Sequence, residues 1–371
     1  MQNPSAKNHR KQVKPMKNVL ILFGSITPEH DLSCKSAARI LENIDRSQYQ
    51  PIAVGITADG KWLYTESTPE EIFDCKAWET SPTNRKALLD LDHGAKSLLV
   101  FEQDGTVQRK AIDVAFARIA GNTGEDGKLQ GVFEVAGIPY VGCGVMASAC
   151  SMDKVTSYLF ADSIGLRRPQ TQVVMRGNYQ KDPEAMIDSI MENLVSRAGF
   201  PIFVKPVSTG SSIGITKALK REDFRSALDT AFRFGEKVVL EEGISGSEIK
   251  VGLLGNEDPQ VGAICELLSN GEWNDFNTKY VAHSSTKNIP ANLPEDVLDM
   301  IREKAIQIYR ALECRGFSRI DFFLTEENEL VFNEINSMPG FQPTSVYPEL
   351  FKAVGVSYTE LISKLIEYAL Q

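Results

Sequence analysis

Short apolar runs alternate with amphipathic stretches in the N-terminal part of the chain. Apolar residues recur at helical spacing from Asp31 to Ile44 and from Lys128 to Ala136. Strands separated by helices are typical of an α/β arrangement with a mostly parallel sheet. We therefore predict an N-terminal α/β domain over residues 17–143. Its expected strands are Val19–Phe23, Pro51–Ile56, Ser97–Phe101, Asp113–Phe116 and Ile138–Val141.

The rest of the pattern predicts two more subdomains, over residues 144–235 and 236–371. The elements expected in the first are a helix from Ala147 to Ile164, helices near Glu184–Arg197 and Arg221–Phe234, and strands around Thr171–Met175, Ile202–Val204 and Ile213–Lys217. Those expected in the second are strands over Lys237–Glu241, Ile249–Leu253 and Gln260–Glu266, a helix from Pro294 to Leu312, a hairpin, and a last helix from Ser357 to Ala369. Residues 1–16 are polar and basic, and we expect a disordered extension there, or residues added to the natural chain.

Hydrophobic periodicity is lost between Ser269 and Ala291. A compact domain rarely contains an idle connection of about 20 residues. We therefore predict that residues 269–291 form a mobile loop that covers a substrate site.

The composition narrows the class of protein. The chain has 371 residues, 42% hydrophobic and 24% charged, with a net charge of −9. No apolar run reaches the ~20 residues that cross a bilayer, and the negative charge argues against nucleic acid, whose binding needs clustered Lys and Arg. Six scattered cysteines fit neither a zinc site nor a disulfide framework. We expect a soluble, cytoplasmic protein that binds neither membrane nor nucleic acid.

The strongest chemical signal is a predicted antiparallel hairpin, in which residues 319–324 and 329–336 alternate in polarity around a short polar stretch. Matching the apolar residues gives these cross-strand pairs: Ile320 with Ile335, Leu324 with Val331, Asp321 with Glu334, and Arg319 with Asn336. Two carboxylates and an amide then converge on one face, and oxygen ligands of this kind select Mg²⁺. The alternative is a solvent-facing pair without function. It fits less well because Phe323 and Phe332 are expected on the same face.

A second signal is a lysine at a strand end followed by a loop rich in glycine and hydroxyl groups. Lys205 precedes Gly210, Ser211 and Ser212 in this loop. Glycines let backbone N–H groups approach phosphate oxygens, and the lysine supplies charge. We predict a phosphate-binding loop, with a plain flexible hairpin as the alternative. Lys154 is expected in the middle of a helix, and this pattern alone favours a solvated lysine over a phosphate ligand.

Two further segments have chemistry that fits a nucleotide site. From Leu240 to Glu248, a predicted strand runs into a turn whose carbonyl groups suit adenine and whose carboxylates suit ribose hydroxyls. Later, Gly340 lies in a sharp turn and could offer a backbone N–H to an oxyanion, with Arg319 neutralising charge on the same intermediate.

Together these residues resemble the D-alanine–D-alanine ligase family, which includes the D-Ala-D-Ser and D-Ala-D-Lac ligases of vancomycin resistance. The likeness extends from about residue 18 to residue 370. The motifs that carry it are Leu22-Phe23-Gly24 with Glu29-His30, Gly124-Glu125-Asp126-Gly127, Gly137-Ile138-Pro139-Tyr140-Val141-Gly142, Met152-Asp153-Lys154, Lys205-Pro206 with Gly210-Ser211-Ser212, Lys279-Tyr280, and Asn333-Glu334-Ile335-Asn336 through Pro339-Gly340.

The resemblance implies an ATP-grasp fold, of α/β (α+β) class, with three subdomains of which the first is Rossmann-like. It implies a homodimeric ligase that uses ATP to join D-amino acids through an acyl phosphate for peptidoglycan precursor synthesis. It also implies two Mg²⁺ ions, for which Mn²⁺ can substitute.

The resemblance assigns roles to residues of this chain. Those implied to bind ATP are Lys154, Lys205, Ser211, Ser212, Glu241, Glu242, Ile244, Glu248, Phe323 and Asn333. The implied metal ligands are Asp321, Glu334 and Asn336. The residues implied at the reacting groups are Glu29, Ser211, Lys279, Tyr280, Arg319 and Gly340, and those at the amino-acid substrates are Glu29, Ser345 and Arg118. Glu29 is implied to hold the ammonium of the first D-alanine and, with Ser211 and Tyr280, to close the loop.

Two segments depart from the family pattern. Ala120 stands where the family has a histidine, with Arg118 where an apolar residue is common, and Gln342-Pro343 alters the segment before Ser345. These changes bear on the second amino acid rather than on ATP. The alternatives are therefore a D-Ala-D-Ser-type or natural-product dipeptide ligase with a changed acceptor, and a non-catalytic nucleotide-binding homologue.

Overall fold

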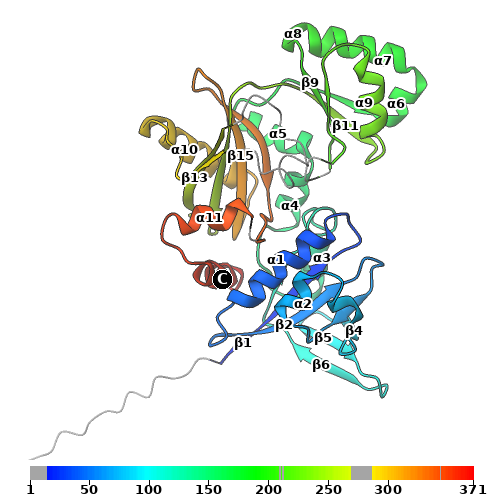
Figure 1. Ribbon diagram of the computed structural model, residues 1–371, viewed down its shortest axis with the longest axis vertical. Coiled ribbons are helices and arrows are strands. Elements are labelled where there is room, and N and C mark those ends of the chain that lie inside the picture. The colour runs from blue at the N-terminus through cyan, green and yellow to red at the C-terminus, as the bar shows by residue number, and fades with distance from the viewer. Residues whose placement is uncertain (1–14, 209, 211–212, 269–285, 343) are drawn as a thin grey trace, which may run out of the picture.

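The computed structural model describes residues 15–208, 210, 213–268, 286–342 and 344–371, and its strands form three sheets. Figure 1 shows three lobes: an N-terminal lobe in blue and cyan, a central lobe in green, and a C-terminal lobe in yellow to red. Helices α4 (Val145–Met152) and α5 (Lys154–Ser163) lie between the lobes. The expected boundaries at residues 143 and 235 stay a prediction.

The N-terminal sheet has seven strands in the order β6-β5-β4-β3-β2-β1-β7. The strands are β1 (Lys17–Gly24), β2 (Tyr49–Ile56), β3 (Trp62–Tyr64), β4 (Arg85–Leu89), β5 (Ser97–Phe101), β6 (Val107–Ala111) and β7 (Val114–Ala117). The helices of this lobe are α1 (His30–Asn43), α2 (Pro69–Phe73), the short 3₁₀ helix η1 (Trp78–Thr80) and α3 (Lys128–Ala136). Six consecutive residues of β1 are buried, which is typical of a central strand covered on both faces.

The prediction of a mostly parallel sheet is wrong. Only the pairings of β1 with β2 and with β7 are parallel, whereas β2 to β6 form an antiparallel meander. Apolar runs reveal buried central strands, but β3, β4 and β6 have only three to five residues and are mostly exposed or half-buried, so the pattern did not reveal them. The expected strand Ile138–Val141 is also wrong, because the segment makes a single bridge between Tyr140 and Ala115.

The expected helix from Ala147 to Ile164 is two helices that meet at Asp153. The backbone of Asp153 is extended, and its carboxylate accepts a hydrogen bond from the N–H of Thr156 at 2.9 Å, which caps the N-terminus of α5. Lys154 is therefore the first residue of α5, not a residue in the middle of a helix.

The central sheet has four antiparallel strands in the order β10-β9-β11-β8. The strands are β8 (Thr171–Met175), β9 (Ile202–Pro206), β10 (Thr216–Ala218) and β11 (Lys237–Glu242). The helices of this lobe are α6 (Arg176–Lys181), α7 (Pro183–Ile190), η2 (Met191–Val195), α8 (Ser196–Ala198) and α9 (Asp223–Ala231), and most of them share its hydrophobic core. The strand expected over Ile213–Lys217 begins only at Thr216.

The C-terminal sheet has five antiparallel strands in the order β14-β13-β12-β15-β16. The strands are β12 (Ser247–Leu254), β13 (Gln260–Leu268), β14 (Thr286–Asn288), β15 (Phe317–Leu324) and β16 (Leu330–Asn336). One face packs against α10 (Glu295–Ala311) and α5. On the other face, α11 (Val346–Lys352), which the pattern did not predict, approaches closely at Gly252, where a Cβ would lie 3.0 Å from the Phe351 ring.

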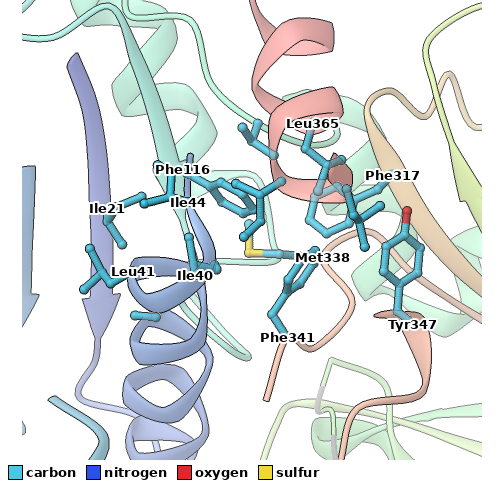
Figure 2. Packing of buried hydrophobic residues seen from close by; sticks show 14 of the residues in the cluster. Ile21, Ile40, Leu41, Ile44, Phe116, Phe317, Met338, Phe341, Tyr347 and Leu365 are labelled. Carbon is cyan, nitrogen blue, oxygen red and sulfur yellow. The ribbon is translucent and has the colours of Figure 1, made fainter. Parts of the chain in front are cut away.

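The N-terminal and C-terminal lobes share one hydrophobic core. Figure 2 shows Ile21, Ile40 and Phe116 of the first lobe next to Phe317, Met338, Phe341 and Leu365 of the last. Phe341 makes edge contacts with both Phe116 and Phe317. Helix α12 (Tyr358–Ala369) contacts α1 and β7, so the end of the chain packs against its beginning. This core fixes the first lobe against the C-terminal sheet.

All six cysteines are free thiols, as the sequence predicts. The fold nevertheless brings two pairs together: Cys34 with Cys75, and Cys143 with Cys314. Among the described residues, none of the helices combines the length and the apolar character of a membrane span.

Candidate active site

A cleft of about 330 Å³ opens where the three lobes meet. The predicted site residues that line it are Glu29, Arg118, Lys154, Lys205, Glu241, Glu242, Ile244, Glu248, Arg319, Asp321, Phe323, Asn333, Glu334, Asn336, Gly340 and Ser345. The predictions for Ser211, Ser212, Lys279 and Tyr280, and most of the loop at 269–291, lie outside the described residues. Every predicted site residue that the structure describes thus faces one cavity.

The hairpin of β15 and β16 forms the end of this cleft at which a metal site is predicted, called the metal end below. Its pairs are Arg319 with Asn336, Ile320 with Ile335, Asp321 with Glu334, Phe322 with Phe332, Phe323 with Val331 and Leu324 with Leu330. The pair expected for Leu324 is wrong, because the register shifts after Asp321. The shift leaves Asn333 unpaired, so Asn333 and Glu334 both line the cleft although they are adjacent in sequence. Phe332 consequently turns into the core, away from Phe323.

Asp321 is buried between two cations. Arg319 donates one hydrogen bond to each of its carboxylate oxygens, both at 2.7 Å, and the Nζ of Lys250 lies 2.9 Å from Oδ2. Burial alone would raise the pKa of Asp321, but the positive charges of Arg319 and Lys250 outweigh it and hold that pKa well below its usual range. The carboxylate is therefore ionised at neutral pH.

The residues at this end of the cleft fit Mg²⁺. Asp321 and Glu334 supply carboxylate oxygens, and Asn336 adds an amide oxygen to the same lining. The buried Nδ2 of Asn336 has no hydrogen-bond partner among the described residues and could donate to a phosphate oxygen. No three His, Cys, Asp or Glu side chains in the described part of the chain are arranged to hold a metal by themselves. Mg²⁺ typically takes one or two carboxylates and completes its shell with phosphates and water.

Lys154 reaches the metal end from the opposite wall. Its Nζ lies 3.5 Å from Oε2 of Glu334, and its side chain is buried. Lys154 owes this position to the cap at Asp153, which also pairs with Lys237 at 2.5 Å. A cation between helix α5 and the paired carboxylates is placed to contact a phosphate that shares their metal ion.

The inner wall carries a second buried charge network. Lys205 of β9 pairs with Oε2 of Glu241 on the neighbouring strand β11, and Tyr158 donates a 2.8 Å hydrogen bond to Oε1. Glu241 is 1% exposed, so both oxygens need these partners. Burial, followed by the charge of Glu241, raises the pKa of Tyr158 well above its usual value, so its hydroxyl stays a donor.

The N-terminal lobe closes the far side with Glu29, at the start of α1. Gly121 has a φ of +74°, which favours glycine, and a Cβ there would lie 2.0 Å from Oε2 of Glu29, so a larger residue would displace the carboxylate. The ideal Cβ position of Gly210 is 3.5 Å from Oε1, which brings the predicted phosphate loop to the same carboxylate. Glu29 thus lies where this loop meets the first lobe.

Arg118 and Glu125 form a charged pair next to Glu29 and Gly340. The Nη1 of Arg118 lies 3.3 Å from Oε1 of Glu125, and Nη2 lies 3.7 Å from the ideal Cβ position of Gly340. Arg118 is 5% exposed, and its buried Nε has no partner among the described residues. Burial raises the pKa of Glu125 to about 7, although the charge of Arg118 opposes the shift.

Sequence reasoning missed the roles of Lys250 and Glu125. Glu125 belongs to the Gly-Glu-Asp-Gly motif, yet nothing in the sequence revealed its contact with Arg118. Lys250 lies two residues after Glu248 on a strand, and this spacing on one face was the available signal. Its Nζ is 3.2 Å from Oε2 of Glu248.

The fold and the site define the class of protein. A cleft between a four-stranded and a five-stranded antiparallel sheet, with lysines facing a pair of carboxylates, is the arrangement of the ATP-grasp ligases, and this chain is an ATP-grasp ligase. Two family models match it: "D-ala D-ala ligase N-terminus" over residues 18–143 and "D-ala D-ala ligase C-terminus" over residues 160–367. The chain belongs to the D-alanine–D-alanine ligase family, as the motifs predict.

Individual relatives agree with this assignment. The chain is 39% identical to a D-alanine–D-alanine ligase of Acetivibrio thermocellus, with 96% of each chain covered, and 38% identical to one of Prosthecochloris aestuarii, covering 96% and 99%. Among solved structures, it is similar to the VanG D-Ala:D-Ser ligase of Enterococcus faecalis, with a TM-score of 0.85, 34% identity, and 96% and 100% coverage. It is also similar to the D-alanine-D-alanine ligase of Coxiella burnetii, with a TM-score of 0.80, 27% identity, and 96% and 94% coverage.

Proposed function

We propose that this protein joins two D-alanine molecules at the expense of ATP and so supplies a dipeptide for peptidoglycan precursor synthesis. The observation that carries the proposal is the cross-strand pair of Asp321 and Glu334, which faces Lys154 inside a cleft that also contains Lys205 and Glu29. The family assignment supplies the substrate class. The names of the curated relatives at 36–39% identity support D-alanine as that substrate.

ATP would lie between the central and C-terminal sheets. Its phosphates would contact Lys154 and Lys205, and the adenosine would lie along the end of β11 at Glu241, Glu242 and Ile244. Glu248 would accept hydrogen bonds from the ribose hydroxyls. The two lysines would spread the charge that develops on the transferred phosphoryl group.

The metal would lie at the end of the cleft that Asp321, Glu334 and Asn336 line. When bound, Mg²⁺ neutralises the phosphate oxygens and polarises the γ-phosphoryl group. Its carboxylate partners are fixed by the hairpin, so they need little rearrangement when the nucleotide arrives.

The first D-alanine would place its ammonium at Glu29 and its carboxylate toward the γ-phosphorus. Attack by that carboxylate releases ADP and gives an acyl phosphate. The amine of the second D-alanine, whose carboxylate would lie at Ser345, then attacks the acyl carbon and displaces phosphate. Arg319 and the N–H of Gly340 would stabilise the tetrahedral oxyanion. Water must be excluded because an acyl phosphate hydrolyses readily, and closure of the predicted loop with Lys279 and Tyr280 would do this.

The test is turnover with purified protein, ATP, Mg²⁺ and D-alanine. Phosphate release should depend on D-alanine and be absent with L-alanine, and the product mass should be that of D-Ala-D-Ala. A protein that binds ATP but releases no phosphate with any D-amino acid would instead be the non-catalytic homologue, and the proposal would fail.

A second candidate function is ligation with a polar acceptor such as D-serine. Two observations favour it: the 34% identity to VanG at a TM-score of 0.85, and the charged Arg118 beside Gly340, whose buried Nε–H has no hydrogen-bond partner among the described residues. A hydroxyl on the acceptor would supply an oxygen at this place. Competition between D-alanine and D-serine, followed by mass spectrometry of the products, measures the preference. A mixed panel of D-amino acids also covers the case of a natural-product dipeptide ligase.

We further propose a cytoplasmic location and a homodimer. ATP as a substrate and the free thiols favour the cytoplasm, while the dimer rests on the family resemblance. Fractionation of the source cells and light scattering of the purified protein measure the two properties.

A further inference from the structure

Lys250 occupies a central position in the metal end of the cleft. It lies in β12, the middle strand of the C-terminal sheet, directly across from Asp321 of β15. Its Nζ is 2.9 Å from Asp321 Oδ2 and 3.2 Å from Glu248 Oε2, and only 9% of its side chain is exposed. Lys250 therefore connects an expected metal ligand to an expected ribose ligand.

The two carboxylates at the metal end differ in how much positive charge surrounds them. Asp321 receives both nitrogens of the Arg319 fork as well as the ammonium of Lys250. Glu334 has a side chain that is 32% exposed, and Lys154 lies 3.5 Å away. A divalent cation that approached Asp321 would meet two positive charges within hydrogen-bond distance of its ligand, those of the buried Lys250 and of the half-buried Arg319. At Glu334, the ammonium of Lys154 lies farther from the carboxylate.

We propose that Lys250 is a built-in cation of the metal site, which neutralises Asp321 so that the protein holds one divalent ion tightly, at Glu334 and Asn336, instead of the two that the family resemblance implies. The proposal rests on the proposed function, since the cleft must take a metal and a nucleotide. The ammonium of Lys250 then supplies, next to the nucleotide phosphates, part of the positive charge that a second metal ion would supply.

Lys250 is suited to this role because its ammonium lies in a fixed position between the carboxylates of Asp321 and Glu248. The strand holds the Lys250 backbone, and the two carboxylates hold its ammonium. A fixed charge of this kind is present before the nucleotide binds and lowers the affinity for a divalent ion by electrostatic repulsion.

The test counts Mn²⁺ ions bound to the full chain by electron paramagnetic resonance, first without nucleotide and then with ADP. Wild type should hold one tight ion per chain. In Lys250→Met, which leaves Asp321 paired with Arg319, Mn²⁺ should bind about tenfold more tightly, or a second tight ion should appear. Lys250→Arg keeps the charge and should bind Mn²⁺ like wild type.

The matched control is Lys287→Met. Lys287 lines the same cleft from β14 but pairs with Glu349 at 3.4 Å, so its loss removes the same charge without a contact to Asp321. It should leave the ion count and the affinity as in wild type.

Two tight ions in wild type would overturn the proposal whether or not Lys250→Met folds. So would a folded Lys250→Met with unchanged Mn²⁺ affinity, or an equal gain in Lys287→Met. The number of bound Mn²⁺ ions can be measured without amino acids and without turnover. A wild-type protein that binds one ion but makes no dipeptide would therefore contradict the proposed function and still support this inference.

Discussion

Asp321 and Glu334 are cross-strand partners at the last regular pair before the bulge in the β15–β16 hairpin. Because the register shifts immediately after Asp321, Asn333 joins Glu334 on the cleft face while Phe332 enters the core. One extra residue thus adds a polar side chain to the cleft lining without exposing an aromatic ring. This relationship places Glu334, the partner of Asp321, 3.5 Å from Lys154 and underlies the prediction for the metal end.

Glu334→Gln tests the metal end. The amide keeps the shape but removes the charge, so the metal should bind weakly and kcat should fall by at least about 100-fold. The fold should persist because the Glu334 side chain is 32% exposed. Steady-state kinetics over a range of Mg²⁺ concentrations measures the loss. Glu329→Gln, beside the turn of the same hairpin with a side chain 51% exposed, is the control and should retain activity. Wild-type kinetics for Glu334→Gln would exclude Glu334 as a ligand.

Lys205→Met tests the inner wall. It leaves buried Glu241 with Tyr158 but without its cation, so we expect a loss of about 3 kcal/mol in the free energy of unfolding and a rise of at least about tenfold in KM for ATP. Urea unfolding and ATP titration measure these effects. The control is Lys217→Met, because Lys217 lies over the same Phe203 ring as Lys205. Its free energy of unfolding and its KM for ATP should remain near those of wild type. Equal effects of the two substitutions would contradict a specific role for the Lys205–Glu241 pair.

Asp153→Ala tests how Lys154 is positioned. Loss of the helix cap should cost about 1 kcal/mol of stability, and the freed start of α5 should raise KM for ATP several-fold. Asp182 caps α7 in the same way, through the N–H of Ala185 at 3.0 Å, but it does not line the cleft. Asp182→Ala should therefore cost similar stability and leave KM unchanged. If both variants changed KM alike, positioning by the cap would be the wrong explanation.

Glu125→Gln tests the shifted carboxyl group. The pKa of Glu125 rises from an ordinary 4.5 to about 7 in the folded chain. Between these values the folded protein binds more protons than the unfolded one, so stability falls as the pH rises through this window. Glu125→Gln has no carboxyl group to titrate at this position. Between about pH 5 and pH 8 it should therefore lose less stability than wild type, by on the order of 2 kcal/mol.

Urea unfolding at the two pH values measures this difference. The exposed acid Glu327, changed to Gln, serves as the control and should keep the wild-type pH dependence. A Glu125→Gln protein that loses as much stability with pH as wild type would mean that Glu125 ionises normally in the fold.

Local patterns in the sequence identified much of this site. Alternation of polar and apolar residues predicted the hairpin, and matching its apolar pairs placed Asp321 across from Glu334. This worked because side chains alternate across a strand, so a short segment fixes its own register near the matched pair. The motifs likewise singled out Lys154 and Lys205, which line the cleft, and correctly predicted the family.

Tertiary structure alone decided which distant residues meet. The bulge at Asn333, the antiparallel meander of the first lobe, and the contacts of Lys250 with Asp321 and of Arg118 with Glu125 have no local signature. Each depends on segments brought together by packing, such as the core shared by Phe116 and Phe341. Sequence periodicity records the environment of a residue along its own element. The partner that a buried charge finds across the cleft depends on how the lobes pack.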